Sequence, residues 1–344
     1  VVSGIVLSYE FGTNFSRCSA FAGEIIGPLM GYEVLSAFFL EAGFLGILLF
    51  GWQRVSPRVH FFATLMVALG TLASTFWILA ANSWMQTPAG HVIVDGRAVV
   101  ADWWAVVFNP SFPYRRRHMI TASFLAGAFF VLGAGAWHAL QRRDSAFART
   151  HMKLGLGLAL VLAPLQVLIG DLHGLNVRAH QPLKVAAMEG LWDTTRGAPL
   201  LLFALPDAKA ERNRYEFAIP KLASLILTHE REGEVQGLKS VPPGERPPVA
   251  LVFWSFRVMV GLGFAMLATA AWGLDNTLSR AVADRDPGQV VMFKGALGAV
   301  ATTLLALIFA EPAPGLWPAL GLLAIGATGY GLSLRFYLLA QRAF

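Results

Sequence analysis

Charge and cysteine are both scarce in this 344-residue chain, and each shortage excludes a class of protein. Charged residues make up 14% of the sequence, whereas a soluble domain carries about a quarter. The single cysteine, Cys18, excludes an internal disulfide and a metal site built from several cysteines. The sequence also lacks a P-loop, a dinucleotide-binding glycine fingerprint, an HExxH pair, a nucleophile elbow and a signal-peptide pattern.

Hydrophobic residues make up 56% of the chain and the mean hydropathy is +0.56, which indicates an integral membrane protein. The long apolar runs predict an all-α, polytopic transmembrane helix bundle. We expect the end of a helix at 1–9, an interfacial connector at 10–30, and spans at 31–52, 59–82, 118–140, 154–170, 248–272, 290–311 and 317–339. The chain starts inside an apolar run without methionine, so we expect its true start upstream.

These runs divide the chain into an N-terminal bundle at 1–170, a long polar segment at 171–247 and a C-terminal bundle at 248–344. Short loops rich in lysine and arginine mark the cytoplasmic side of a membrane protein. This rule makes 171–247 external, although the arginine run 115–117 argues against the orientation. The formal net charge of +6 is therefore attributed to cytoplasmic loops and not to nucleic-acid binding.

Two carboxylates, Glu33 and Glu41, stand inside the predicted span 31–52. Eight residues is a little more than two helical turns, so both are expected on nearly the same face. A carboxylate within the bilayer costs several kcal/mol unless a partner, a metal or water meets it. The pair indicates a proton path or a site beside a metal or cofactor, and the alternative is pairing with basic groups in the bundle.

His118 and Met259 come from two different predicted spans and could together ligate a six-coordinate haem iron. Arg257 lies two residues before Met259 and needs an anion, which the propionates of a haem would provide. The alternatives are a methionine that only packs and a histidine that caps a helix.

Three further charged residues are candidates for a functional site. Lys184 and Glu189 lie five residues apart in the polar segment, where a short amphipathic helix could capture a lipid-like head group. The alternative is a solvated surface helix. Glu311 ends the predicted span 290–311, and by itself it is most simply a carboxylate at the membrane interface.

Several strings occur together in one order and resemble subunit I of the cytochrome bd quinol oxidases. They are YEFGTN (9–14), GYEVLSAFFLEAGFLGILLFGW (31–52), FWILAANSWMQTPAG (76–90), KVAAMEGLW (184–192) and FWSFRVMVG (253–261). The resemblance implies a membrane enzyme that oxidises quinol and reduces dioxygen to water with two haems b and one haem d. In that family the polar segment is called the Q-loop, and that name is used below for residues 171–247.

The resemblance also implies roles for the residues on the electron side. His118 and Met259 match the axial pair of the low-spin haem b, and Arg257 matches an arginine beside that haem. Lys184 and Glu189 match the quinol-binding pair of the Q-loop.

On the oxygen side, Glu33 and Glu41 match acids near the oxygen-reducing haems, and Ser74 matches a hydroxyl on the proton path. Glu311 matches the glutamate of the high-spin haem b. The family further implies a second integral subunit, a small single-span subunit and a place in the bacterial cytoplasmic (inner) membrane.

The sequence departs from the family in three places. It begins after the family's first helix, which carries a haem-ligating histidine, and its Q-loop is compact. The string after Glu311, FAEPAPGLWP, lacks the family's arginine and glutamine. The missing histidine and the altered string after Glu311 favour an alternative, a related electron-transfer or structural subunit that binds only the low-spin haem b. A transporter with a midplane carboxylate is a third reading, but it gives Arg257 and Met259 no role.

Overall fold

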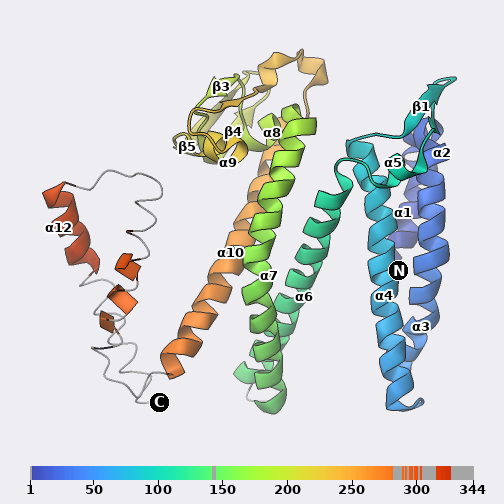
Figure 1. The fold of residues 1–344 in the computed structure, drawn as a ribbon, viewed down its shortest axis with the longest axis horizontal. Helices are drawn as coiled ribbons and strands as arrows, with labels where there is room; N and C mark the ends of the chain where they lie inside the picture. The colour runs from blue at the N-terminus through green and yellow to red at the C-terminus, as the bar shows by residue number, and fades with distance from the viewer. Residues whose placement is uncertain are drawn as a thin grey trace. The chain divides into compact units, whose positions relative to one another are not determined.

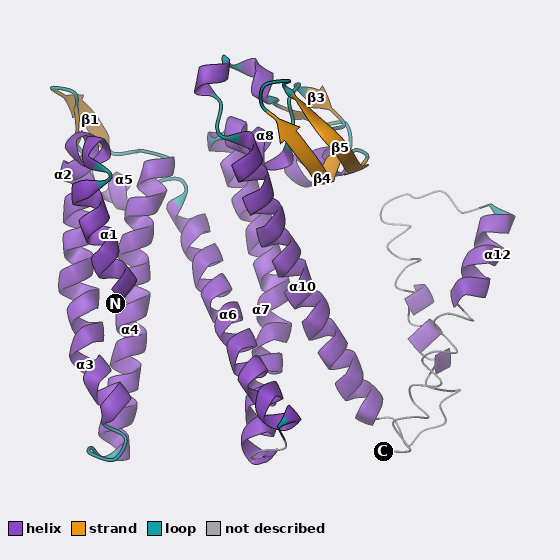
Figure 2. Cartoon of the chain, turned by 180° about the vertical axis from the view of Figure 1, so that it is seen from behind, coloured by secondary structure: helices purple, strands orange, loops and turns teal. Residues whose placement is uncertain are grey.

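The computed structural model describes residues 2–141 and 145–281, and beyond them 289, 291–292, 294–296, 298–300, 303 and 315–326. Within these residues five helices are long and apolar enough to cross a membrane, namely Ser16–Phe50, Pro57–Gln86, Phe112–Leu140, Ala146–His180 and Val249–Asp275. The predicted helical membrane bundle is therefore confirmed, and its elements can be followed in Figures 1 and 2.

The chain forms two compact units, 1–267 and 268–344. The second unit contains the end of α10 (Val249–Ala281) and α12 (Leu316–Ile325). The predicted spans 290–311 and 317–339 lie largely outside the described residues, and Glu311 lies outside them entirely.

The first span begins earlier than the sequence predicted. Residues 10–30 are not a connector, because α1 (Val2–Thr13) and α2 (Ser16–Glu33) cover most of them. The π-helical turn η1 (Val34–Phe38) and α3 (Phe39–Phe50) continue the helix. Buried residues of α2 recur at the helical spacing of three and four, at Ala22, Ile25, Ile26 and Leu29. The scattered glycines of this segment concealed that pattern, and Glu33 consequently lies near the middle of a span.

Helix α4 (Pro57–Gln86) packs along α2, η1 and α3. Its first turn is capped by the Ser56 hydroxyl, which accepts a hydrogen bond from the Val59 amide, and Pro57 suits the first helical position. The hairpin of β1 (His91–Val94) and β2 (Arg97–Val100), followed by α5 (Trp103–Val107), connects α4 to α6. Buried residues of α2, α4, β2 and α5 form one apolar core.

Helices α6 (Phe112–Leu140) and α7 (Ser145–His180) pack closely against each other. A Cβ atom on Gly155 would lie 2.7 Å from the Ala128 carbonyl oxygen, so only glycine permits this approach. Helix α7 extends ten residues past the predicted end of its span at 170, and the first part of the Q-loop is therefore helical.

The rest of the Q-loop is a small mixed structure. Helices α8 (Pro182–Glu189) and α9 (Leu222–Thr228) accompany two short antiparallel sheets, and 3₁₀ turns end the segment at η2 (Leu238–Ser240) and η3 (Pro243–Glu245). In one sheet β3 (Thr195–Arg196) pairs with β6 (Glu234–Val235), and in the other β4 (Leu200–Asp207) pairs with β5 (Arg212–Ile219). The strands are a local addition to a helical protein.

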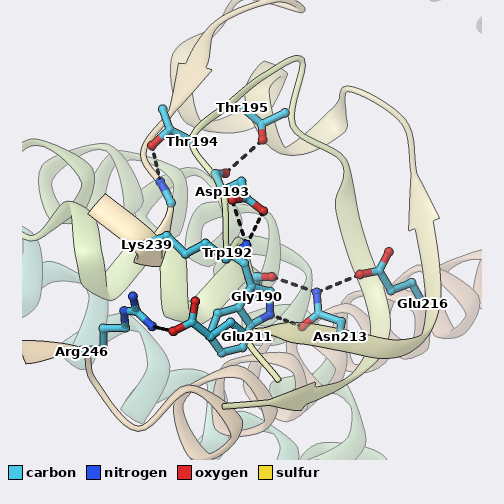
Figure 3. A network of polar contacts seen from close by, with 11 residues as sticks. Gly190, Trp192, Asp193, Thr194, Thr195, Glu211, Asn213, Glu216, Lys239 and Arg246 are labelled. Atoms are coloured by element: carbon cyan, nitrogen blue, oxygen red, sulfur yellow. Dashed lines mark hydrogen bonds and ion pairs between the residues drawn. The ribbon is translucent and has the colours of Figure 1, made fainter. Parts of the chain in front are cut away.

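Polar contacts connect the parts of the Q-loop, as Figure 3 shows. Asn213 of β5 accepts a hydrogen bond from the Trp192 indole at 2.9 Å and donates one to the Gly190 carbonyl oxygen at 2.9 Å. At the other end of the segment, Arg246 forms an ion pair with Glu211 at 2.7 Å. The hairpin of β4 and β5 is thus tied to the end of α8 and to the strand-free residues before α10.

Candidate functional site

Glu33 has a neutral partner. The Ser74 hydroxyl of α4 donates a hydrogen bond to Glu33 Oε1 at 2.7 Å, and both side chains are half-buried. No ion pair among the described residues includes Glu33 or Glu41. The structure therefore brings together two predicted residues, Glu33 and Ser74, across two helices.

The π-helical turn η1 lies between Glu33 and Glu41 and decides on which side of the helix each side chain lies. Eight residues of regular α-helix leave two side chains about 80° apart, whereas a π turn accommodates one extra residue and reduces that offset to about 20°. Glu33 accordingly contacts Ser74, while a Cβ atom on Gly70 would lie 3.2 Å from Glu41 Cβ. Gly70 and Ser74 are one turn apart on α4, so both acids face the same stripe of that helix.

His118 lies in the second turn of α6, against α7. The amide nitrogen of Gln166 lies 3.3 Å from His118 Nδ1 and 3.2 Å from Nε2, and the His173 ring centroid lies 5.3 Å from that of His118. One amide nitrogen equally close to both ring nitrogens sits over the ring and not along either lone pair. Among the described residues, Gln166 is the one hydrogen-bonding neighbour of the ring nitrogens of His118.

Buried polar atoms without a partner gather on the two helices that hold His118. In the described residues they include Gln166 Oε1 and His173 Nε2 on α7 and Arg115 Nε on α6. Such atoms are costly to bury and usually indicate a ligand or water that completes their hydrogen bonds. Gln166 and His173 are seven residues apart, two turns along one face of α7.

Arg257 and Glu189 form a buried ion pair. The Arg257 Nη2 atom lies 2.6 Å from Glu189 Oε2, and the two side chains expose only 9% and 7% of their surfaces. Arg257 also donates from Nε to the Leu201 carbonyl oxygen at 2.5 Å, and its guanidinium lies over the Phe253 ring. The anion that the sequence predicted beside Arg257 is thus a carboxylate of this chain. Met259, one helical half-turn further, exposes 49% of its surface.

Lys184 points away from Glu189. Five residues of helix turn side chains about 140° apart, and the Lys184 ammonium donates to Gln86 Oε1 of α4 at 3.0 Å. Gln181 donates to the Gln86 carbonyl oxygen at 3.0 Å. Burial, and then the positive charge of Arg115, lower the pKa of Lys184 below its ordinary value. The predicted quinol-binding pair therefore occupies two faces of α8, one toward α4 and one toward α10.

Sequence reasoning assigned no role to Gln86, Gln181 or Gln166. Gln86 belongs to the quoted string FWILAANSWMQTPAG, and Gln181 stands directly before α8, so both were visible as polar residues beside a predicted site. Gln166 lies in a predicted span, where an amide side chain needs a partner. That requirement was the signal that could have identified it.

Comparison with known proteins identifies the family of this chain. The family model described as "Cytochrome bd terminal oxidase subunit I" matches residues 1–322. The chain belongs to this family. The cytochrome bd ubiquinol oxidase subunit 1 of Bacillus subtilis is 36% identical, over 80% of this chain and 61% of that protein. The cytochrome bd-II ubiquinol oxidase subunit 1 of Escherichia coli is 32% identical, over 81% of this chain and 67% of that protein.

A solved structure agrees with the family. The bd oxidase from Geobacillus thermodenitrificans matches with a TM-score of 0.69 and 31% sequence identity, over 79% of this chain and 63% of that chain. The chain thus spans about three fifths of the Bacillus and Geobacillus proteins. It is a membrane-integral member of the cytochrome bd subunit I family, whose relatives are named quinol oxidases.

The residues of this bd-family chain fit a haem. His118 offers an imidazole and Met259 offers a half-exposed thioether, the two donor types that ligate a six-coordinate haem iron. The unpaired Arg115 Nε and the Lys184 ammonium are cations at the same end of α6 and α8, suited to acidic groups of a cofactor.

Proposed function

We propose that this chain is the haem-carrying catalytic subunit of a bd-type terminal oxidase, which oxidises membrane quinol and reduces dioxygen to water. The observation that carries the proposal is the setting of His118, an imidazole inside a membrane helix with buried, unpaired polar atoms around it. His118 and Met259 would hold the low-spin haem b, and Glu311 the high-spin haem b. Together with haem d, these groups supply the one-electron chemistry when bound.

Quinol binding is assigned to the side of α8 that faces α4. Lys184, Gln86 and Gln181 offer one ammonium and two amides there, which can donate to and accept from the hydroxyl groups of quinol. The lowered pKa of Lys184 makes this ammonium a readier proton donor than an ordinary lysine. Glu189, on the other face of α8, orients that helix through its ion pair with Arg257.

Proton delivery is assigned to the acids that face α4. Glu33 has the neutral Ser74 hydroxyl as its partner, and Glu41 lies two turns further on the same stripe. Protons for water formation enter from the cytoplasmic side past Glu41, Ser74 and Glu33, and quinol protons leave outside. The reaction is then electrogenic without a pump.

We place the enzyme in the bacterial cytoplasmic (inner) membrane, with a second integral subunit, subunit II, and a small single-span subunit. Its other proposed partners are quinone and lipid, and we do not propose nucleic acid as a partner. The composition and the five apolar helices support this placement.

A second candidate function is an electron-transfer or structural subunit that binds only the low-spin haem b. The string FAEPAPGLWP favours it, because the family's arginine and glutamine after the high-spin haem glutamate are replaced here. Haem content separates the two candidates, since the oxidase subunit binds three haems and the relay binds one.

The test is a dithionite-reduced minus oxidised optical spectrum of the purified complex, with haem quantified as the pyridine haemochrome. We expect b-type bands together with a red chlorin band. His118→Ala should remove the low-spin haem b band, whereas His60→Ala should leave it, because His60 bonds the Leu48 carbonyl oxygen at 3.0 Å, distant in sequence from this site. An unchanged band in His118→Ala contradicts the ligand assignment, and one b-type haem per chain supports the relay.

A further inference from the structure

The β4–β5 hairpin of the Q-loop has large apolar side chains that the described residues leave exposed, and these side chains are called its apolar face. Tyr215 exposes 79% of its surface and Phe217 exposes 64%. Smaller exposed fractions belong to the neighbouring residues Leu202, Leu205 and Ile219. Exposed apolar side chains gathered on a water-facing loop are unfavourable, and they usually mark a contact with a partner or a membrane.

The hairpin is packed on the start of α10. Leu201 and Ala204 form a buried cluster with Phe253, and the Phe203 ring meets the Trp254 ring edge-on at 5.2 Å between centroids. The Leu201 carbonyl oxygen accepts from Arg257 at 2.5 Å. These interactions fix the hairpin to the start of α10, and the contacts of Asn213 and Glu211 drawn in Figure 3 tie it to the end of α8 and to Arg246 before α10.

Helix α10 fixes the level at which the hairpin lies. The apolar span begins at Val249, and the hairpin contacts Phe253 and Trp254 in the first two turns of that span. The end of an apolar span lies near the lipid head groups. The hairpin attached to these turns therefore lies at the same level.

We propose that the apolar face of the β4–β5 hairpin is inserted into the boundary between lipid head groups and acyl chains, so that lipid covers Tyr215 and Phe217. Tyrosine and other aromatic side chains are favoured at this depth because their rings are apolar and their polar groups reach water. The continuity of the hairpin with the membrane-spanning α10 argues for lipid as the occupant. The inference concerns membrane seating and holds whichever haem content the chain has.

The experiment uses the whole complex in lipid nanodiscs. A nitroxide label is attached at Phe217→Cys, and separately at Tyr215→Cys, in a Cys18→Ser background, with the same background lacking a new cysteine as the blank. Both positions are exposed, so these variants are expected to fold. The matched control is Lys209→Cys, in the charged turn between β4 and β5. Collisions with oxygen, which concentrates in lipid, are compared with collisions with a water-soluble nickel chelate.

We expect the labels at 215 and 217 to collide several-fold more with oxygen than with nickel, and the label at 209 to show the reverse. Nickel collisions at 217 equal to those at 209 would mean that water covers the face, and the proposal would fall. Low collision with both reagents would mean that a protein covers it, which also overturns the proposal. A photoreactive phenylalanine at position 217 provides a second measurement, with crosslinks expected to lipid and not to another subunit.

Discussion

Two glutamates of this chain show how differently a membrane protein can hold the same side chain. Glu189 is almost fully buried against Arg257. Glu33, near the middle of a span, has a serine hydroxyl as its partner. Neutralising Glu189 would leave a guanidinium buried without its counter-ion, which costs several kcal/mol. Neutralising Glu33 leaves no charge behind. The first glutamate is suited to holding structure and the second to exchanging protons.

The largest effect is expected from breaking the ion pair on one side. Glu189→Ala should destabilise the complex by about 3–5 kcal/mol, because Arg257 stays buried and unpaired. The double variant Glu189→Leu with Arg257→Met removes both charges and should lose less stability than Glu189→Ala. The thermal unfolding midpoint of the complex measures the stability of each variant. The single variants Glu189→Leu and Arg257→Met are measured beside the double variant. If the double variant lowers the midpoint by the sum of the two single decreases, the ion pair is not the cause of the destabilisation.

The next effect separates chemistry from stability at Glu33. Glu33→Gln keeps an oxygen that can accept from Ser74, so the thermal midpoint should stay unchanged. The amide cannot carry a proton, so oxygen consumption with quinol should fall about 100-fold, the size of a general acid–base contribution. Wild-type turnover in Glu33→Gln would mean that Glu33 is not part of the proton path and has a structural role, as Glu189 has.

A smaller effect is expected from separating the helices that hold the acids. In Gly70→Ala the new Cβ would lie 3.0 Å from the Glu41 amide nitrogen and 3.2 Å from the Ala37 carbonyl oxygen. Such crowding costs about 1–3 kcal/mol. Gly46→Ala on α3 is the matched control, since its Cβ would meet nothing within 4 Å. Equal midpoints for the two variants would contradict close packing of α4 on the acid-bearing helix.

The smallest effect is expected from Ser74→Ala. Loss of one hydrogen bond should cost about 0.5–1.5 kcal/mol, and it should slow oxygen reduction less than Glu33→Gln does. A comparison of steady-state turnover in the two variants tests this ranking. If Ser74→Ala is as slow as Glu33→Gln, the hydroxyl itself carries protons and does more than orient the carboxylate.

Sequence patterns predicted the membrane class and most spans because burial in lipid requires long apolar helices. They failed at residues 10–30, where glycines suggested a connector although Ala22, Ile25 and Leu29 follow a helical period. They also ended α7 ten residues early, because polar residues such as Asn176 and Arg178 continue that helix beyond its apolar part. The apolar length predicts a span, but tertiary contacts decide where its helix stops.

The candidate site divides in the same way. The sequence alone determined which side chains are unusual in a membrane, since Glu33, His118 and Arg257 are polar groups inside apolar runs. Only the tertiary structure decided their partners. It joined Glu33 to Ser74 through the register of a π turn, and Arg257 to Glu189 across 68 residues of sequence. An ion pair between distant segments depends on how helices and loops pack, and no local pattern records that packing.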